Sequence, residues 1–167
     1  MRSRIEYITA APELLEAMQP LNDYVRNCGL ETSLIDLVLI RASQINGCAY
    51  CINMHTKEAR ARGETEQRIY GLNAWRETPF YSERERAALA WTEAVTLVTD
   101  GHVPDDVYEE ARKQFTEVEL VNLTVAIGLI NAWNRLSIAF RSVPGRDRPG
   151  RATRAEKEAG RVEAKYH

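Results

Sequence analysis

Three side chains capable of nucleophilic or proton-transfer chemistry lie in one short stretch, at the spacing of a helix face. Cys48, Cys51 and His55 fall within eight consecutive positions of a 167-residue chain that has three cysteines and three histidines in all. Residues three or four apart lie on the same side of a helix, so all three side chains point one way. The stretch therefore brings together two thiols and an imidazole.

The same thiols are expected at the start of a helix. Asn46 and Gly47 break the chain immediately before Cys48, and a helix that begins there has unpaired backbone N–H groups and the positive end of its dipole in the first turn. Such an environment lowers the pKa of a thiol and favours the thiolate, which is the reactive form. With His55 placed to accept or return a proton, the pattern predicts a dithiol redox site.

Two other interpretations fit the same residues. One is a structural zinc site, but Cys-x-x-Cys-x-x-x-His supplies three ligands, whereas structural zinc normally has four. Cys28, Asp36 or His102 would have to supply the fourth, and none of them lies at a recognisable ligand spacing. The other interpretation is a set of buried small side chains on an apolar helix, which explains one cysteine easily and the aligned triplet poorly.

The elements that position these residues are all predicted to be helices. No segment sustains the alternation typical of a strand, so the predicted fold class is all-α. The helix over residues 32–45 is apolar on most sides and should be central. Two capping boxes, Ser82 with Glu85 and Thr116 with Glu119, begin later helices. The expected helices cover residues 14–28, 32–45, 48–63, 65–75, 82–99, 104–114 and 116–140.

Composition sets the broad class of the protein. The chain is 44% hydrophobic and 28% charged with a net charge of −2, which predicts a soluble globular domain and gives no sign of nucleic-acid or membrane attraction. The N-terminus lacks the apolar run of a secretory signal. The longest apolar stretch, residues 120–140, is interrupted by polar side chains and is expected to be a buried helix. A cytoplasmic location follows as an expectation, and closely spaced cysteines there are more often catalytic or metal-binding than structural.

The C-terminal residues differ from the rest of the chain. From Arg141 onward there are eight basic and four acidic residues, and almost no large apolar side chains. We therefore predict one helical domain over residues 1–143 and a charged tail over residues 144–167. Such a tail is expected to be solvated, partly helical or disordered, or else docked across a subunit boundary.

The sequence around the cysteines resembles a known family. The run IDLVLIRASQINGCAYCINMH, residues 35–55, is similar to the core motif of the alkylhydroperoxidase (AhpD-like) branch of the carboxymuconolactone decarboxylase superfamily. The similarity continues through GETEQR, RERAALAWTE and INAWNR, and so covers about residues 5–143. The matching residues of the motif are Arg41, Ser43, Gln44, Asn46, Gly47, Cys48, Tyr50, Cys51 and His55.

This resemblance implies a cysteine-dependent peroxidase or disulfide oxidoreductase with an all-helical fold that assembles as homotrimers or homohexamers. It implies that Cys51 attacks the hydroperoxide, that Cys48 resolves the sulfenic acid to a disulfide, and that His55 and an acidic residue relay protons. An external dithiol, on a lipoyl-carrying or thioredoxin-like protein, would reduce the disulfide, and neither a cofactor nor a metal is expected. The lactone decarboxylases of the superfamily do not depend on this cysteine pair, so a decarboxylase-like lyase is the less favoured alternative.

The acidic residue of the relay departs from the family pattern. The position twelve residues before the first cysteine is usually glutamate and is here Asp36. Aspartate is one methylene shorter, so a contact from Asp36 to His55 or Cys48 would need a bridging water or would be lost. The alternative for Asp36 is a structural residue on the polar side of its helix.

Other polar or reactive residues have simpler explanations. Asn131 and Asn134 are three apart on the long C-terminal helix, where they either line a pocket under the thiols or satisfy backbone groups and partner helices, and we favour the second. Cys28 completes an apolar stripe and is expected to be a buried thiol at a helix end. His102 lies in a turn and should be exposed.

Overall fold

The computed structural model describes residues 2–145, and within that range the chain forms helices and no strands, which confirms the all-α prediction. The short α1, which precedes the predicted elements, has no counterpart among them. The elements are α1 (Tyr7–Ala10), α2 (Glu13–Arg26), α3 (Thr32–Ile45), α4 (Ala49–Ala61), α5 (Glu66–Gly71), the 3₁₀ helix η1 (Leu72–Glu77), α6 (Glu83–Thr96), α7 (Asp105–Gln114) and α8 (Glu117–Ala139).

Local sequence explains where several helices begin. Both predicted capping boxes are present: the Ser82 hydroxyl accepts from the Glu85 N–H and the Thr116 hydroxyl from the Glu119 N–H, while each glutamate side chain accepts from the N–H of its capping residue. These reciprocal bonds satisfy backbone donors that the first turn of a helix leaves unpaired. The sequence therefore fixes the start of α6 and α8 without help from the rest of the fold.

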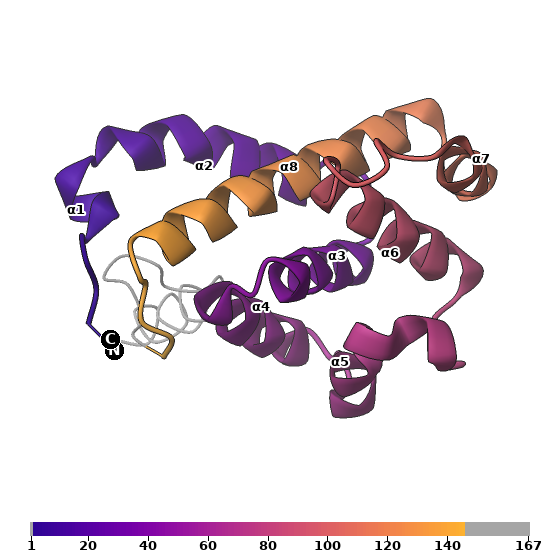
Figure 1. The fold of residues 1–167 in the computed structure, drawn as a ribbon, viewed down its shortest axis with the longest axis horizontal. Coiled ribbons are helices and arrows are strands. Elements are labelled where there is room, and N and C mark those ends of the chain that lie inside the picture. The colour runs from indigo at the N-terminus through magenta and orange to yellow at the C-terminus, as the bar shows by residue number, and fades with distance from the viewer. Residues whose placement is uncertain (1, 146–167) are drawn as a thin grey trace, which may run out of the picture.

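The apolar helix α3 lies at the centre of the domain, as predicted (Figure 1). It packs against α4, α6 and α8, and three of its side chains, Leu37, Val38 and Ile40, are fully buried. A helix that is apolar on most sides is stable only when other helices cover it on several sides. Burial of this helix therefore explains why three others are arranged around it.

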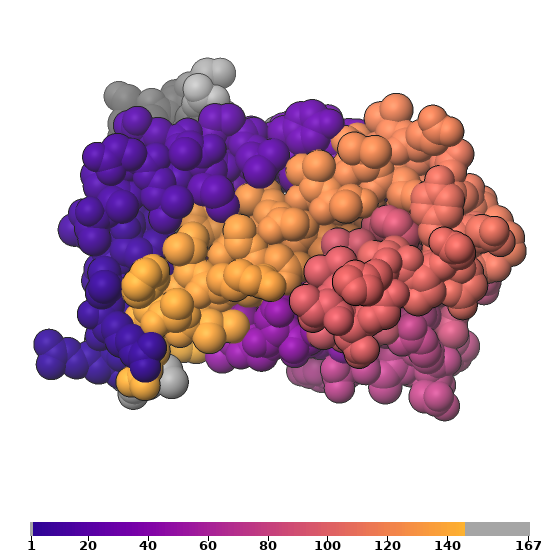
Figure 2. All heavy atoms as spheres, turned by 45° about the horizontal axis from the view of Figure 1, so that its top comes forward, coloured from indigo at the N-terminus to yellow at the C-terminus, as the bar shows by residue number. Residues whose placement is uncertain are grey.

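The long helix α8 crosses the domain between the N-terminal helices and α6–α7, as the space-filling view shows (Figure 2). Its inner face is buried through Leu123, Ala126, Ile127 and Ile130, which confirms that the long apolar stretch is a buried helix. No single helix in the described range has the length and apolarity needed to cross a membrane, and the one combination that meets those criteria joins α7 and α8 across a 118° bend. The predicted tail beyond residue 145 lies outside the described residues.

Candidate functional site

The turn between α3 and α4 places Cys48 at the start of α4. The Cys48 N–H bonds the Ser43 carbonyl at 2.9 Å and the Gly47 N–H bonds the Gln44 carbonyl at 3.1 Å, which is the hydrogen-bond pattern of a Schellman motif. Gly47 has a φ of +67°, a conformation that costs little for glycine and more for other residues. Cys48 consequently closes α3 and is also the N-cap residue of α4.

The two thiols of the motif lie side by side. Neither Cys48 nor Cys51 is in a disulfide, and the Cys48 thiol donates a hydrogen bond to the Cys51 sulfur at 2.7 Å. Each residue is 1% exposed, and the pair packs against Ala42 of α3 and Ile130 of α8. We call Cys48 and Cys51 the thiol pair. Its sulfurs lie close enough that a disulfide between them requires little movement of the backbone.

The Cys48 thiol is a weaker acid than an ordinary cysteine. The hydrogen bond to Cys51 and burial both raise the pKa of the Cys48 thiol well above its ordinary value, and hydrogen bonds from the Cys51 N–H and the Ser137 hydroxyl lower it only in part. The expectation that the helix start lowers the thiol pKa is therefore wrong for Cys48. Desolvation and the neighbouring sulfur outweigh the helix N–H groups there.

Two hydroxyl groups from distant parts of the chain lie in series on the Cys48 side of the thiol pair, with the first in contact with Cys48. The Ser137 hydroxyl of α8 hydrogen bonds the Cys48 sulfur, and the Tyr7 hydroxyl of α1 lies 3.4 Å from the Ser137 oxygen. Tyr7 is buried and its ring packs 5.7 Å from that of Phe140. Sequence reasoning missed both residues because a contact between positions 7 and 137 has no local pattern.

His55 lies one turn after Cys51 on α4, and its side chain is only 6% exposed. Its Nδ1 is 3.3 Å from a carboxylate oxygen of Glu58. Glu58 is a functional candidate that sequence reasoning missed, although its position three residues after His55 on the same helix is a usable signal. The imidazole therefore has a carboxylate partner on its own helix.

Asp36 lies on α3 and is 4% exposed. Its two carboxylate oxygens accept from the Arg62 guanidinium, at 2.7 Å from Nε and 2.5 Å from Nη2. Arg62 Nη2 is also 3.7 Å from Glu58, so Asp36 connects to His55 through these two side chains. The role of Asp36 in a proton relay stays a prediction, whereas its place in a bidentate ion pair is part of the structure.

A buried amide network holds the turn that carries Cys48. The Asn46 side chain donates to the side-chain oxygens of Asn131 at 2.9 Å and Asn134 at 2.8 Å. Asn134 in turn donates to the Ser43 hydroxyl at 3.1 Å. The favoured structural interpretation of Asn131 and Asn134 is confirmed, because their side chains tie α8 to the end of α3.

The remaining candidates lie apart from the thiol pair. The prediction that Cys28 is buried is wrong, because it is half-buried and lies just beyond the end of α2, where its thiol donates to the Val25 carbonyl at 3.1 Å. His102 is exposed, as predicted. Among residues 2–145, no group of three or more His, Cys, Asp or Glu side chains is arranged to hold a metal ion. This includes the Cys48, Cys51 and His55 cluster.

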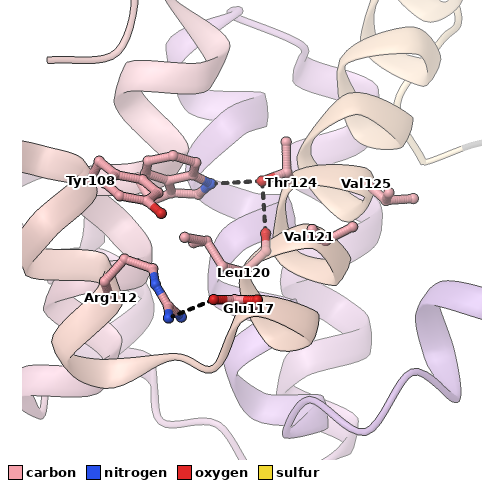
Figure 3. Close-up of a pocket in the computed structure, with 8 residues that line it drawn as sticks. Tyr108, Arg112, Glu117, Leu120, Val121, Thr124 and Val125 are labelled. Carbon is pink, nitrogen blue, oxygen red and sulfur yellow. Dashed lines mark hydrogen bonds and ion pairs between the residues drawn. The ribbon is translucent and has the colours of Figure 1, made fainter. Parts of the chain in front are cut away.

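A shallow groove of about 340 Å³ lies between α6, α7 and the first turns of α8, away from the thiol pair (Figure 3). Tyr108, Leu120 and Val121 contribute to its largely apolar lining. The Arg112–Glu117 ion pair, 3.4 Å long, lies at its rim. None of the predicted redox residues lines this groove.

Comparisons with known proteins agree with the family resemblance of the sequence. Residues 12–94 match the carboxymuconolactone decarboxylase family. The uncharacterized Bacillus subtilis protein YdfG is 45% identical over 140 residues, which make up 84% of this chain and 95% of YdfG. A crystal structure of an Agrobacterium tumefaciens protein of unknown function, for which a role as the antioxidant defence protein AhpD has been suggested, has a TM-score of 0.84 at 46% identity and covers 87% of this chain and 100% of that one.

A more distant structure shares the fold alone. The debrominase Bmp8 has a TM-score of 0.75 at 22% identity, over 82% of this chain and 74% of Bmp8. At this level of identity the structural likeness shows the common helical fold and gives no information about the reaction.

Proposed function

The chain belongs to the carboxymuconolactone decarboxylase family, in its AhpD-like branch, and we propose that it is a thiol-dependent oxidoreductase that reduces hydroperoxides with Cys51 and Cys48. The observation that carries the proposal is the thiol pair itself, two reduced thiols whose sulfurs lie 2.7 Å apart at the start of α4. His55, one turn further along the helix, supplies a proton carrier. The suggested antioxidant role of the similar Agrobacterium protein supports the same chemistry.

In the proposed first step, the Cys51 thiolate attacks one oxygen of the hydroperoxide. A sulfur–oxygen bond forms as the O–O bond breaks, and the leaving alkoxide takes a proton delivered through His55. The products are an alcohol and a sulfenic acid on Cys51. The roles fit the proton on Cys48, because the hydrogen bond from Cys48 to the Cys51 sulfur stabilises a negative charge on Cys51.

In the second step, Cys48 loses its proton and attacks the sulfenic sulfur. The Cys48–Cys51 disulfide forms as the sulfenic oxygen leaves and is protonated to water. An external dithiol then donates two electrons, which returns both cysteines to thiols and leaves the donor as a disulfide. A lipoyl-carrying or thioredoxin-like protein supplies that dithiol, and the cycle requires no metal or organic cofactor.

Burial of the thiol pair controls its access. Each thiol is 1% exposed, so neither a hydroperoxide nor a reductant reaches it without movement of neighbouring side chains. Tyr50 and Trp133, which are partly buried and pack against the pair, are the side chains whose movement would open it. Assembly as a homotrimer or homohexamer belongs to the same proposal and would add to this cover.

Peroxide consumption by the C51S variant tests the proposal. With hydrogen peroxide or cumene hydroperoxide and a dihydrolipoyl or thioredoxin reductant, the variant is expected to lose roughly a thousandfold or more in rate, because serine does not replace the thiolate nucleophile. The C28S variant is the matched control and should keep the rate of the unchanged protein. Wild-type turnover by C51S with every reductant would overturn the proposal.

Two further results would favour the alternatives. Near-stoichiometric zinc in protein purified without chelator would support a structural metal site. A lactone-type decarboxylation that survives loss of both Cys48 and Cys51 would support a lyase.

A further inference from the structure

The carboxylate beside His55 is Glu58, which lies on the same helix. His55 Nδ1 and the Glu58 carboxylate oxygen are 3.3 Å apart, and the two side chains are 6% and 15% exposed. We propose that Glu58, rather than Asp36, is the residue that positions His55 for proton transfer at the thiol pair. This proposal deepens the proposed function and rests on it.

The surroundings of Asp36 explain why it does not take this role directly. Each of its carboxylate oxygens accepts from Arg62, at 2.5 Å and 2.7 Å. A bidentate pair of this kind fixes both partners and uses the side of the carboxylate that would otherwise be available to another donor. Asp36 therefore acts on Arg62, and its shorter side chain is sufficient for that contact.

Arg62 connects the two carboxylates. Its Nη2 lies 2.5 Å from Asp36 and 3.7 Å from Glu58, and the hydrogen bonds from Arg62 to Asp36 raise its pKa above the ordinary value, so it stays charged. We call His55, Glu58, Arg62 and Asp36 the charged chain. Along it the signs alternate whenever His55 is protonated, and each charge has a partner of opposite sign.

Glu58 has two effects on the imidazole. When Nδ1–H donates to the carboxylate, Nε2 is left as the unprotonated nitrogen that can accept a proton and return it. When the ring is protonated, the negative charge of Glu58 compensates the positive charge in a buried site. This is the arrangement in which a base is oriented by a third group.

Arg62 and Asp36 support this role at one remove. A half-buried Glu58 is costly to ionise beside a neutral imidazole, and the Arg62 guanidinium offsets that cost. Asp36 holds Arg62 in place from the neighbouring helix α3. The chain therefore predicts an order of importance in which Glu58 comes before Asp36.

The test compares variants in a single turnover with hydrogen peroxide. The rate constant for oxidation of Cys51 should fall about 10- to 100-fold in E58A, as is typical when a partner that orients a histidine is removed. E58Q should fall between E58A and wild type, because the amide oxygen still accepts from Nδ1–H but carries no charge. E66Q, which removes an exposed carboxylate, is the matched control and should react like wild type.

A double variant separates Asp36 from Glu58. D36N should slow the reaction less than E58A, and adding D36N to E58A should produce little further loss, because Asp36 acts through Arg62 on Glu58. An equal loss in D36N that persists in the E58A background would overturn the proposal. So would an unchanged rate in E58A.

A spectroscopic measurement keeps this test independent of the proposed function. Nitrogen-15 NMR of the reduced protein should show the proton of neutral His55 on Nδ1 in wild type and in D36N, and should show a loss of this preference in E58A. If the tautomer changes as expected but no variant reacts with peroxide, the proposed function fails while the positioning role stands. If the tautomer is the same in E58A and wild type, the positioning role fails.

Discussion

The two cysteines of the thiol pair share one buried site but have different neighbours. Cys51 lies on α4 together with His55 and Glu58, which are charged or chargeable groups of the same helix. Cys48 has the Ser137 hydroxyl of α8 as a neighbour, and the Tyr7 hydroxyl of α1 lies 3.4 Å from the Ser137 oxygen. Under the proposed function, proton transfer in the first step depends on groups placed by local helix spacing, whereas control of the second thiol depends on the completed fold.

If the Ser137 hydroxyl acts on Cys48 alone, its removal should slow formation of the Cys48–Cys51 disulfide and leave oxidation of Cys51 unchanged. The S137A variant loses a hydrogen bond that stabilises the Cys48 thiolate, so the pKa of Cys48 should rise further and resolution of the sulfenic acid should slow by about tenfold. The rate of Cys51 oxidation should stay the same. Capture of the sulfenic acid by dimedone, timed after a peroxide pulse, measures its lifetime.

The control for S137A is T124V, which removes a hydroxyl from the same helix away from the thiol pair. It should leave the sulfenic acid lifetime unchanged. A slower Cys51 oxidation in S137A, with an unchanged rate of disulfide formation, would show that the Ser137 hydroxyl acts on the first step and not on the second.

The raised pKa of Cys48 also links stability to pH. The folded protein keeps the Cys48 thiol protonated at pH values above the pKa of the unfolded thiol. The contribution of this group to the free energy of unfolding is therefore complete below the unfolded pKa and declines as the pH rises above it. Above pH of about 8.5 the free energy of unfolding should fall by about 1.4 kcal/mol per pH unit from this group. Urea unfolding of reduced wild type and C48S between neutral and alkaline pH measures the difference, and parallel curves for the two proteins would contradict it.

The smallest expected effect concerns the turn at Gly47 between α3 and α4, which precedes both cysteines. The G47A variant should be destabilised by about 1 kcal/mol, because alanine is disfavoured at the φ of +67° that ends α3. G128A is the matched control, since Gly128 lies within α8 with open space around it and no positive φ, and it should be neutral or slightly stabilised. Chemical unfolding of the two variants provides the comparison, and an equal response would show that the turn does not depend on glycine.

The difference between contacts set by helix spacing and contacts set by packing explains which features could be predicted from the sequence. The bounds of α3, both capping boxes and the short separation of Cys48 from Cys51 follow from local spacing, and the structure contains them. The alignment of His55 with the two thiols stays a prediction. Glu58 was within reach of the same reasoning, because it lies three residues after His55. The family pattern, in contrast, points to Asp36.

Other features were not accessible from local patterns. Tyr7 meets Ser137 across 130 positions, and the bidentate contact between Asp36 and Arg62 requires two helices to be placed side by side. The rise in the pKa of Cys48 depends on burial and on the neighbouring sulfur. Helix spacing indicates which residues share a face, but the solvent that the fold removes from that face becomes known only from the packed structure.

Mass spectrometry of the protein before and after a mild pulse of hydrogen peroxide tests whether Cys48 and Cys51 form a disulfide. We expect the oxidised chain to lose two hydrogen atoms, and we expect this loss on the single tryptic peptide that contains Cys48 and Cys51, as an internal disulfide, with Cys28 still a thiol. In C48S the same pulse should leave a sulfenic acid on Cys51. A wild-type chain in which Cys48 and Cys51 both remain reduced, at peroxide levels that oxidise Cys28, would rule out the proposed role of Cys48 and Cys51.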